Sequence, residues 1–254
     1  MAQVKVEGCQ PKNIFLLAGQ SNMSGRGGNY DDTDNNIIKW DGEIPPECSP
    51  NPNILRLNAN KSWEEAHEPL HQDIDCSKTC GIGPGMPFAN AILAKDPSFG
   101  SIGLVPCAIG GTRIVEWARG AALYNQLVDR AKASLNGGGG KIRALLWYQG
   151  ESDTSEQDSK LYKGRFEKFI NDLRQDLDQP DLPIIMVGIC SADQGPFMNL
   201  IRSVQLNFDE KNVKCVDGMG STFLADDKHL DTKSEICVGL KLADAFLSSF
   251  AHIS

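Results

Sequence analysis

The chain has 254 residues, of which 41% are hydrophobic and 23% are charged, as is usual for a globular protein. At this length a chain buries a large core without disulfide or metal crosslinks. Its 33 acidic residues exceed its 25 Lys and Arg residues, so the net charge is −8, and no basic stripe for a nucleic acid or an anionic membrane is visible. No apolar run approaches the ~20 residues that a membrane span needs. We therefore expect neither a nucleic acid nor a membrane as a partner.

The N-terminal residues MAQVKVEGCQPKN contain no apolar segment of the kind found in secretory signal peptides, which favours a cytoplasmic location. Among the cysteines, Cys48, Cys76 and Cys80 lie in loop-like sequence, where a disulfide and free thiols are both open alternatives. No second cysteine pair follows Cys76 and Cys80 at the spacing of a zinc ribbon. The cysteines therefore do not indicate a structural metal.

Short apolar runs alternate with amphipathic stretches along the chain. The runs predict strands over residues 13–18, 102–108, 144–149, 183–190 and 213–217. They are continuous rather than alternating, as expected for strands that are covered on both faces. Helical spacing of apolar residues is found over 124–135, 161–177, 198–208 and 231–250. The alternation implies right-handed βαβ units, and so an α/β fold around a mostly parallel, five-stranded sheet.

The segment from about residue 25 to 85 departs from this pattern. It is rich in Asn, Asp, Pro and Gly and contains only short apolar pieces, such as residues 54–57. We interpret it as a long loop insertion laid over the domain, and loops of this length in a compact domain are usually functional. No linker or internal repeat divides the chain, so we expect a single domain over residues 1–254.

A serine follows the first predicted strand, in the sequence Gly19-Gln20-Ser21-Asn22-Met23. Ligands of open α/β sheets bind beyond the carboxyl ends of the strands, so Ser21 is a candidate nucleophile. The alternative is that Ser21 only caps the helix that follows. The pattern is not the G-x-S-x-G elbow of α/β-hydrolases, because Met23 stands where the second glycine should be.

A serine nucleophile needs a base, and His229 precedes the last predicted helix with Asp226 three residues before it. A carboxylate at that spacing can hold the Nδ1–H of the imidazole and leave Nε2 facing the serine. The alternative is a surface histidine in a polar loop. The pattern makes His229 the candidate base and Asp226 the group that orients it.

Two further strand ends carry candidate oxyanion donors. Gly110 and Gly111 follow the second predicted strand, where glycine lets a backbone N–H approach a ligand closely. Gln149 ends the third, and its side-chain amide is a second kind of donor to a developing oxyanion. The alternatives are a plain tight turn for the glycines and a half-buried amide bound to loop backbone for Gln149.

Taken together, these segments resemble the four sequence blocks of the SGNH hydrolases. The blocks are GQSNM at 19–23, GGT at 110–112, WYQGESD at 147–153 and DDKH at 226–229. The similarity is greatest to the sialate O-acetylesterase-like branch, which includes acetylxylan esterases and plant probable carbohydrate esterases. The resemblance implies a flavodoxin-like, three-layer α/β/α sandwich and a serine esterase that removes acetyl groups from a sugar or polysaccharide. It implies no metal or organic cofactor.

The same resemblance assigns roles to individual residues. It implies Ser21 as nucleophile, His229 as base and Asp226 as its orienter. It implies an oxyanion hole made by the N–H of Ser21, the N–H of Gly110 or Gly111, with Gly111 favoured, and the side chain of Gln149. The broader superfamily has Asn where this chain has Gln149. Gln20 replaces the Asp of GDSL lipases, which argues against a lipase.

Two other catalytic classes have weaker support in the sequence. Residues 67–71, HEPLH, match the H-E-x-x-H zinc-protease motif, but Pro69 would interrupt the helix that the motif needs. His71 is then left to line the cleft or bind loop backbone. The carboxylates of Glu151 and Asp153 would suit a glycosidase, but they share one loop.

A catalytically weak carbohydrate-binding protein that keeps the fold is the remaining alternative. Loss of the nucleophile would have indicated it, and Ser21 is present. Trp63 and Trp117 are candidates for stacking on a sugar, with simple packing in the core as the alternative for each.

Overall fold

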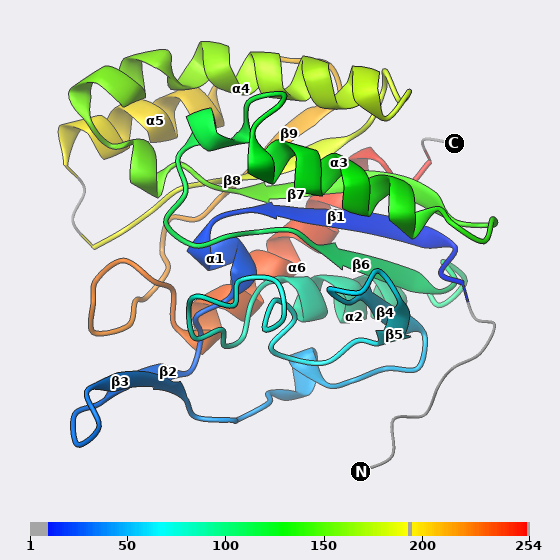
Figure 1. Cartoon of the computed structure of the whole chain (residues 1–254), viewed down its shortest axis with the longest axis horizontal. Coiled ribbons are helices and arrows are strands. Elements are labelled where there is room, and N and C mark those ends of the chain that lie inside the picture. Colours follow the sequence, from blue (N-terminus) through cyan, green and yellow to red (C-terminus); the bar gives the residue numbers. More distant parts are fainter. Residues whose placement is uncertain (1–9, 193–194, 253–254) are drawn as a thin grey trace.

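The computed structural model describes residues 10–192 and 195–252, and its centre is a seven-stranded sheet with the order β5-β4-β6-β1-β7-β8-β9 (Figure 1). The strands are β1 (Asn13–Gly19), β4 (Ile54–Leu57), β5 (Trp63–Glu65), β6 (Ile102–Pro106), β7 (Lys141–Tyr148), β8 (Ile184–Gly188) and β9 (Val213–Asp217). Neighbouring strands pair in parallel except for β4 and β5. The expected α/β fold with a mostly parallel sheet is thereby confirmed.

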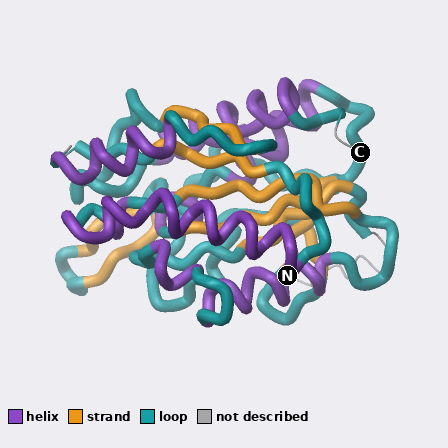
Figure 2. The backbone as a smooth tube through the Cα atoms, turned by 90° about the horizontal axis from the view of Figure 1, so that it is seen from above, coloured by secondary structure: helices purple, strands orange, loops and turns teal. Residues whose placement is uncertain are grey.

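Helices cover both faces of the sheet, as Figure 2 shows from above. The longer helices are α2 (Gly85–Lys95), α3 (Ala122–Ser134), α4 (Glu156–Asp176), α5 (Pro196–Leu206) and α6 (Thr232–Ser249). In Figure 1, α2 and α6 lie on one side of the sheet and α3, α4 and α5 on the other. Within the described residues, no helix is both long and apolar enough to cross a membrane.

Aromatic side chains from alternate faces of the strands build the two halves of the core. Phe15 of β1 packs edge-on against Phe88 of α2 and Phe246 of α6, with ring centroids 4.8 and 4.9 Å apart. On the opposite face, Trp147 of β7 packs against Trp117 and Phe169 at 5.3 and 4.7 Å. Because both faces are covered, every residue of β1 is buried, which explains the continuous apolar runs in the sequence.

All five predicted strands are present, but the sheet has seven strands rather than the expected five. The segment expected to be only a loop supplies β4 and β5, which extend the sheet beyond β6, and a separate hairpin of β2 (Asn29–Asp32) and β3 (Ile37–Trp40). A four-residue strand has no periodicity of its own. Pairing with β6 and full burial decide its structure.

Buried Arg56 on β4 fixes the insertion from within. Its guanidinium donates to Glu64 at 2.8 Å, to Asp73 at 2.8 Å and to the carbonyl of Leu70 at 2.9 Å. A charge-assisted bond of this kind contributes roughly 1.5–3 kcal/mol when the charged group is fully paired. These bonds therefore anchor residues 64–73 of the insertion to β4 of the sheet.

Candidate active site

The loops after β1, β6 and β7 meet because β1 lies between the other two strands in a parallel sheet. Gly19 ends β1 with φ of +130°, and a Cβ atom there would lie 2.1 Å from the carbonyl oxygen of Tyr148 at the end of β7. Only glycine allows this close turn. This turn leads into the short helix α1 (Ser21–Ser24), which follows the end of β1.

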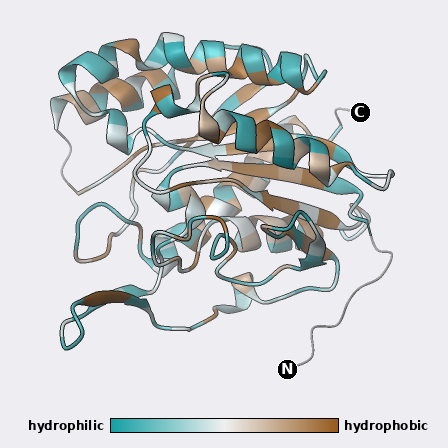
Figure 3. Ribbon diagram, in the orientation of Figure 1, coloured by the Kyte–Doolittle hydropathy of each residue, from teal (hydrophilic) through white to brown (hydrophobic). Residues whose placement is uncertain are grey.

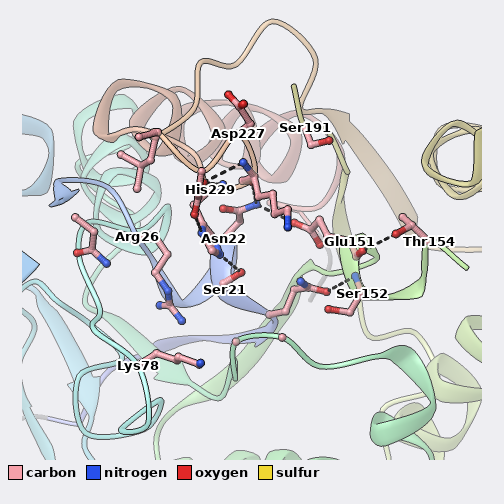
Figure 4. A pocket seen from close by; sticks show the side chains of 18 of the residues that line it. Ser21, Asn22, Arg26, Lys78, Glu151, Ser152, Thr154, Ser191, Asp227 and His229 are labelled. Atoms are coloured by element: carbon pink, nitrogen blue, oxygen red, sulfur yellow. Dashed lines mark hydrogen bonds and ion pairs between the residues drawn. The ribbon is translucent and has the colours of Figure 1, made fainter. Parts of the chain in front are cut away.

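Ser21, His229 and Asp226 form one hydrogen-bonded chain, of which Figure 4 labels Ser21 and His229. Ser21 Oγ lies 2.9 Å from His229 Nε2, and the other ring nitrogen, Nδ1, is hydrogen-bonded to Asp226 Oδ2. When Nδ1 carries the proton, Nε2 is free to accept the proton of the serine hydroxyl. The structure thus brings together the three residues that the sequence singled out, although Ser21 and His229 are 208 positions apart.

Backbone N–H groups of its own loop hold Asp226 in place. Its Oδ1 accepts the backbone N–H groups of Lys228 at 3.0 Å and of His229 at 2.9 Å. Partial burial acts to raise the pKa of Asp226, but these backbone bonds and the bond from the His229 ring outweigh it and lower the pKa. The carboxylate is therefore ionised at neutral pH and favours the tautomer with the proton on Nδ1.

Asn22 joins the loop that carries His229 to the loop after β7. Its Oδ1 accepts the backbone N–H of Leu230 at 3.1 Å, and its Nδ2 donates to Oε1 of Glu151 at 2.8 Å. Burial raises the pKa of Glu151 to about 7. The role of Asn22 was missed in the sequence, where its position beside Ser21 was the only signal.

Gly110 packs directly against the candidate nucleophile. A Cβ atom there would lie 3.5 Å from Cβ of Ser21 and 2.6 Å from Nη2 of Arg26. The Gly110 N–H donates to Oδ2 of Asp75 at 3.1 Å, so it is already used within the protein. Gly111 has φ of +77° and lines the cavity over Ser21, and its N–H has no hydrogen-bond partner among the described residues.

Asp75 comes from the insertion and was not identified from the sequence, because nothing near it resembles a motif. Its carboxylate is buried and accepts from Arg26 Nη2 at 2.5 Å and from Ser24 Oγ at 3.0 Å, besides Gly110. One carboxylate therefore fixes the glycine loop against the residues that follow Ser21. This contact ties the insertion to the site.

The structure does not bring Gln149 into the cavity. Its side chain is fully buried, and its amide nitrogen donates to the carbonyl of Thr112 at 2.9 Å and to Oδ2 of Asp153 at 2.6 Å. Both amide hydrogens are thus used in joining the ends of β6 and β7. The side chain as it lies fits the buried-amide alternative, and its role as an oxyanion donor stays a prediction.

The zinc-protease alternative loses its geometric basis. Residues 67–71 are not helical, and His71 is buried away from the cavity, where burial lowers its pKa to about 3. Over residues 10–192 and 195–252, no group of three or more His, Cys, Asp and Glu side chains is arranged to hold a metal ion. Asp153 is buried and accepts from the N–H of Ile114, so it does not face Glu151 across a substrate.

Other side chains singled out in the sequence lie elsewhere. Trp117 is fully buried in the core, and Trp63 lies on β5 outside the cavity. Cys48, Cys76 and Cys80 are free thiols. None of these residues contributes to the site.

A cavity of about 700 Å³ opens over Ser21 and His229. Its wall includes the loop after β7, the start of α5, the loop that carries His229 and the β2–β3 hairpin. Both polar and apolar residues line this wall. The cavity has the size typical of a site for a drug-sized ligand.

This arrangement defines the chain as an SGNH-type hydrolase: a serine at the start of the short helix α1 and a histidine on a loop meet at the carboxyl edge of a mostly parallel sheet that helices cover on both faces. The family described as carbohydrate esterase, sialic acid-specific acetylesterase matches residues 11–248. The chain therefore belongs to this family of carboxylic ester hydrolases, and the resemblance seen in the sequence is confirmed.

Individual relatives agree with this assignment. The chain is 50% identical over 242 residues to a probable carbohydrate esterase of Arabidopsis thaliana, covering 94% of this chain and 92% of the relative. A crystal structure of an Arabidopsis thaliana protein, also 50% identical, superposes with a TM-score of 0.91 and covers 94% of this chain and 99% of its own.

More distant structures share the fold alone. NanS is 18% identical with a TM-score of 0.75, over 94% of this chain and 98% of its own. A carbohydrate acetylesterase from Xanthomonas citri is 19% identical with a TM-score of 0.64, over 92% of this chain and 55% of its own.

Proposed function

We propose that this protein removes acetyl groups from an O-acetylated sugar or polysaccharide through Ser21, His229 and Asp226 and an acetyl-enzyme intermediate. The observation that carries the proposal is the 2.9 Å contact between Ser21 Oγ and His229 Nε2, with Asp226 behind the ring. Membership of the carbohydrate esterase family supports the acetylated sugar as substrate.

In the first half of the reaction, Ser21 Oγ attacks the carbonyl carbon of the acetyl group while His229 Nε2 takes the serine proton. The carbonyl oxygen becomes an oxyanion, for which we propose the N–H groups of Ser21 and Gly111 as donors. Removing one well-placed donor of this kind costs ~3–4 kcal/mol of transition-state stabilisation. The bond to the sugar oxygen then breaks, and His229 returns the proton to the leaving alcohol.

In the second half, water attacks the acetyl-enzyme and gives its proton to His229. Collapse of the second oxyanion releases acetic acid, and the proton returns to Ser21 Oγ. Asp226 stabilises the imidazolium that forms in both halves and holds the tautomer. The proposed steps use side chains and backbone N–H groups of this chain together with one water molecule, and they require no metal or organic cofactor.

Acetate release from p-nitrophenyl acetate and from acetylated xylose tests the proposal. Wild type is expected to hydrolyse both, and Ser21→Ala and His229→Ala are expected to lose at least ~10³-fold in kcat. Ser248→Ala, an exposed serine on α6, is the matched control and should leave the rates unchanged. Full activity in Ser21→Ala would refute the assignment. Inert wild type that still binds the sugar would support the alternative, a catalytically weak carbohydrate-binding protein.

A further inference from the structure

The β2–β3 hairpin exposes large apolar side chains beside the cavity. Tyr30, Ile37 and Ile38 are 49%, 50% and 54% exposed, although the two strands are only four residues long each. The hairpin stands out from the body of the protein in Figure 1, and part of its ribbon has the colour of hydrophobic residues in Figure 3. Exposed apolar patches beside a site commonly mark binding surfaces.

Two of these three side chains, Tyr30 and Ile38, line the cavity over Ser21. Asn29, Tyr30 and Asp31 are consecutive and all line it, so the cavity runs along the edge of β2 rather than over one face. The half-buried ring of Phe197, from the start of α5, lines the same cavity. In Figure 1, β2 and α5 lie on opposite sides of α1, which carries Ser21.

Polar groups are interleaved with these apolar ones. Asp31, Lys78 and Thr79 line the hairpin side of the cavity. A fatty acyl chain in this position would remove Asp31 and Lys78 from water without replacing their hydrogen bonds, which is costly. A sugar ring presents both a C–H face for aromatic side chains and hydroxyl groups for the polar ones. The composition of the wall therefore matches a carbohydrate.

The cavity is also larger than the reaction requires. Sites for drug-sized ligands measure roughly 300–1,000 Å³, and this one is about 700 Å³. An acetyl group and the one ring that carries it leave much of this volume unused. The unused part extends to Tyr30 and Phe197, on elements that carry none of the three reacting side chains.

We infer that Tyr30 and Phe197 are specificity-determining residues that bind further sugar rings of the leaving group, and this inference rests on the proposed function. The substrate class is then an acetylated oligosaccharide or polysaccharide, rather than an acetylated monosaccharide. The acetyl group lies at Ser21, and the carbohydrate chain continues along the edge of β2.

The test compares kcat/KM for p-nitrophenyl acetate with kcat/KM for chemically acetylated xylo-, manno- and cello-oligosaccharides of one and four rings. Wild type is expected to prefer four rings to one by about tenfold in at least one series. Tyr30→Ala and Phe197→Ala should abolish that preference, because they lower kcat/KM for the four-ring esters by a larger factor than for p-nitrophenyl acetate. Ile37→Ala, equally exposed on the same hairpin but outside the cavity, is the matched control and should retain it.

Equal kcat/KM values for one and four rings in every series would overturn the inference. So would loss of p-nitrophenyl octanoate hydrolysis in Tyr30→Ala with the oligosaccharides unaffected, because the surface would then bind an acyl chain. A wild-type dimer that Tyr30→Ala dissociates would overturn it in favour of self-association.

Sugar binding at Tyr30 and Phe197 can be measured even if the protein hydrolyses no ester. If wild type hydrolyses none of the esters, binding of the unacetylated four-ring sugars is measured by calorimetry. Weaker binding in Tyr30→Ala and Phe197→Ala, but not in Ile37→Ala, would support the carbohydrate surface. No binding, or equal binding in all variants, would refute it.

Discussion

Asn22 Nδ2 donates to Glu151 Oε1 at 2.8 Å, while Oδ1 of the same amide accepts the N–H of Leu230 at 3.1 Å. One side chain thus holds the loop after β7 and the residue that follows His229. The position of the His229 ring relative to Ser21 depends on this bridge, because His229 lies on a loop and not on a helix or strand.

Replacing Asn22 by Ala is therefore expected to lower kcat more than it raises KM. The Leu230 N–H loses its acceptor, and displacement of a catalytic group by ~1 Å can cost about 100-fold. We expect a loss of about 10- to 100-fold in kcat, measured with p-nitrophenyl acetate. Asn125→Ala, an exposed asparagine on α3, is the control. Unchanged kcat in Asn22→Ala would show that the bridge does not position His229.

The raised pKa of Glu151 predicts a pH-dependent stability with a defined sign. Burial raises this pKa from 4.5 to about 7, so the folded state keeps a proton that the unfolded state has lost. The stability contribution of Glu151 therefore falls as the pH rises from about 4.5 to 7 and is constant above.

Glu151→Gln removes this ionisation and retains an oxygen that accepts from Asn22. We expect the variant to gain roughly 1–3 kcal/mol over wild type between pH 4.5 and 8, measured by urea unfolding. Burial also raises the pKa of Glu68, to about 8, with the same sign. Comparing variant with wild type at each pH isolates Glu151. A difference independent of pH would contradict the expectation.

The buried pair of Arg26 and Asp75 predicts a large loss of stability when one partner is removed. Asp75→Asn leaves the Arg26 guanidinium buried without its countercharge, which typically costs about 3–5 kcal/mol. The double variant Arg26→Met/Asp75→Leu should be more stable than Asp75→Asn. Asp73→Asn, which weakens a partly exposed pair with Arg56, is the milder control. Equal unfolding free energies for Asp75→Asn and Asp73→Asn would refute the expectation.

The buried position of Gln149 predicts a structural rather than a catalytic role for its side chain. Gln149→Ala leaves the carbonyl of Thr112 without a donor and leaves the carboxyl of Asp153 with only the N–H of Ile114, and a buried hydrogen-bond partner lost in this way costs about 1–3 kcal/mol of stability. We expect the free energy of unfolding to drop, with any fall in kcat following the loss of folded protein. An oxyanion donor would instead lower kcat by about 10²–10³ with unchanged stability. Measuring both quantities on one preparation distinguishes the two.

The sequence by itself determined five of the seven strands of the sheet and pointed to the residues that we propose as the reacting ones. Strands such as β1 and β7 are buried on both faces, so they appear as uninterrupted apolar runs, and the parallel topology brings their carboxyl ends together. Ser21 follows one of these strands, and Asp226 and His229 share one loop. Residue type, order and short-range spacing were therefore enough to propose a catalytic role for these three residues.

Only the tertiary structure decided what depends on distant contacts. The strands β4 and β5 are too short to show a period and form because β6 offers an edge. Gln149 turns inward because Thr112 and Asp153 accept its hydrogens there. Asp75 reaches Gly110, and Asn22 reaches Leu230, across 35 and 208 positions of sequence. A side-chain amide or carboxylate has several partners of similar energy, and the packing of the whole chain selects among them.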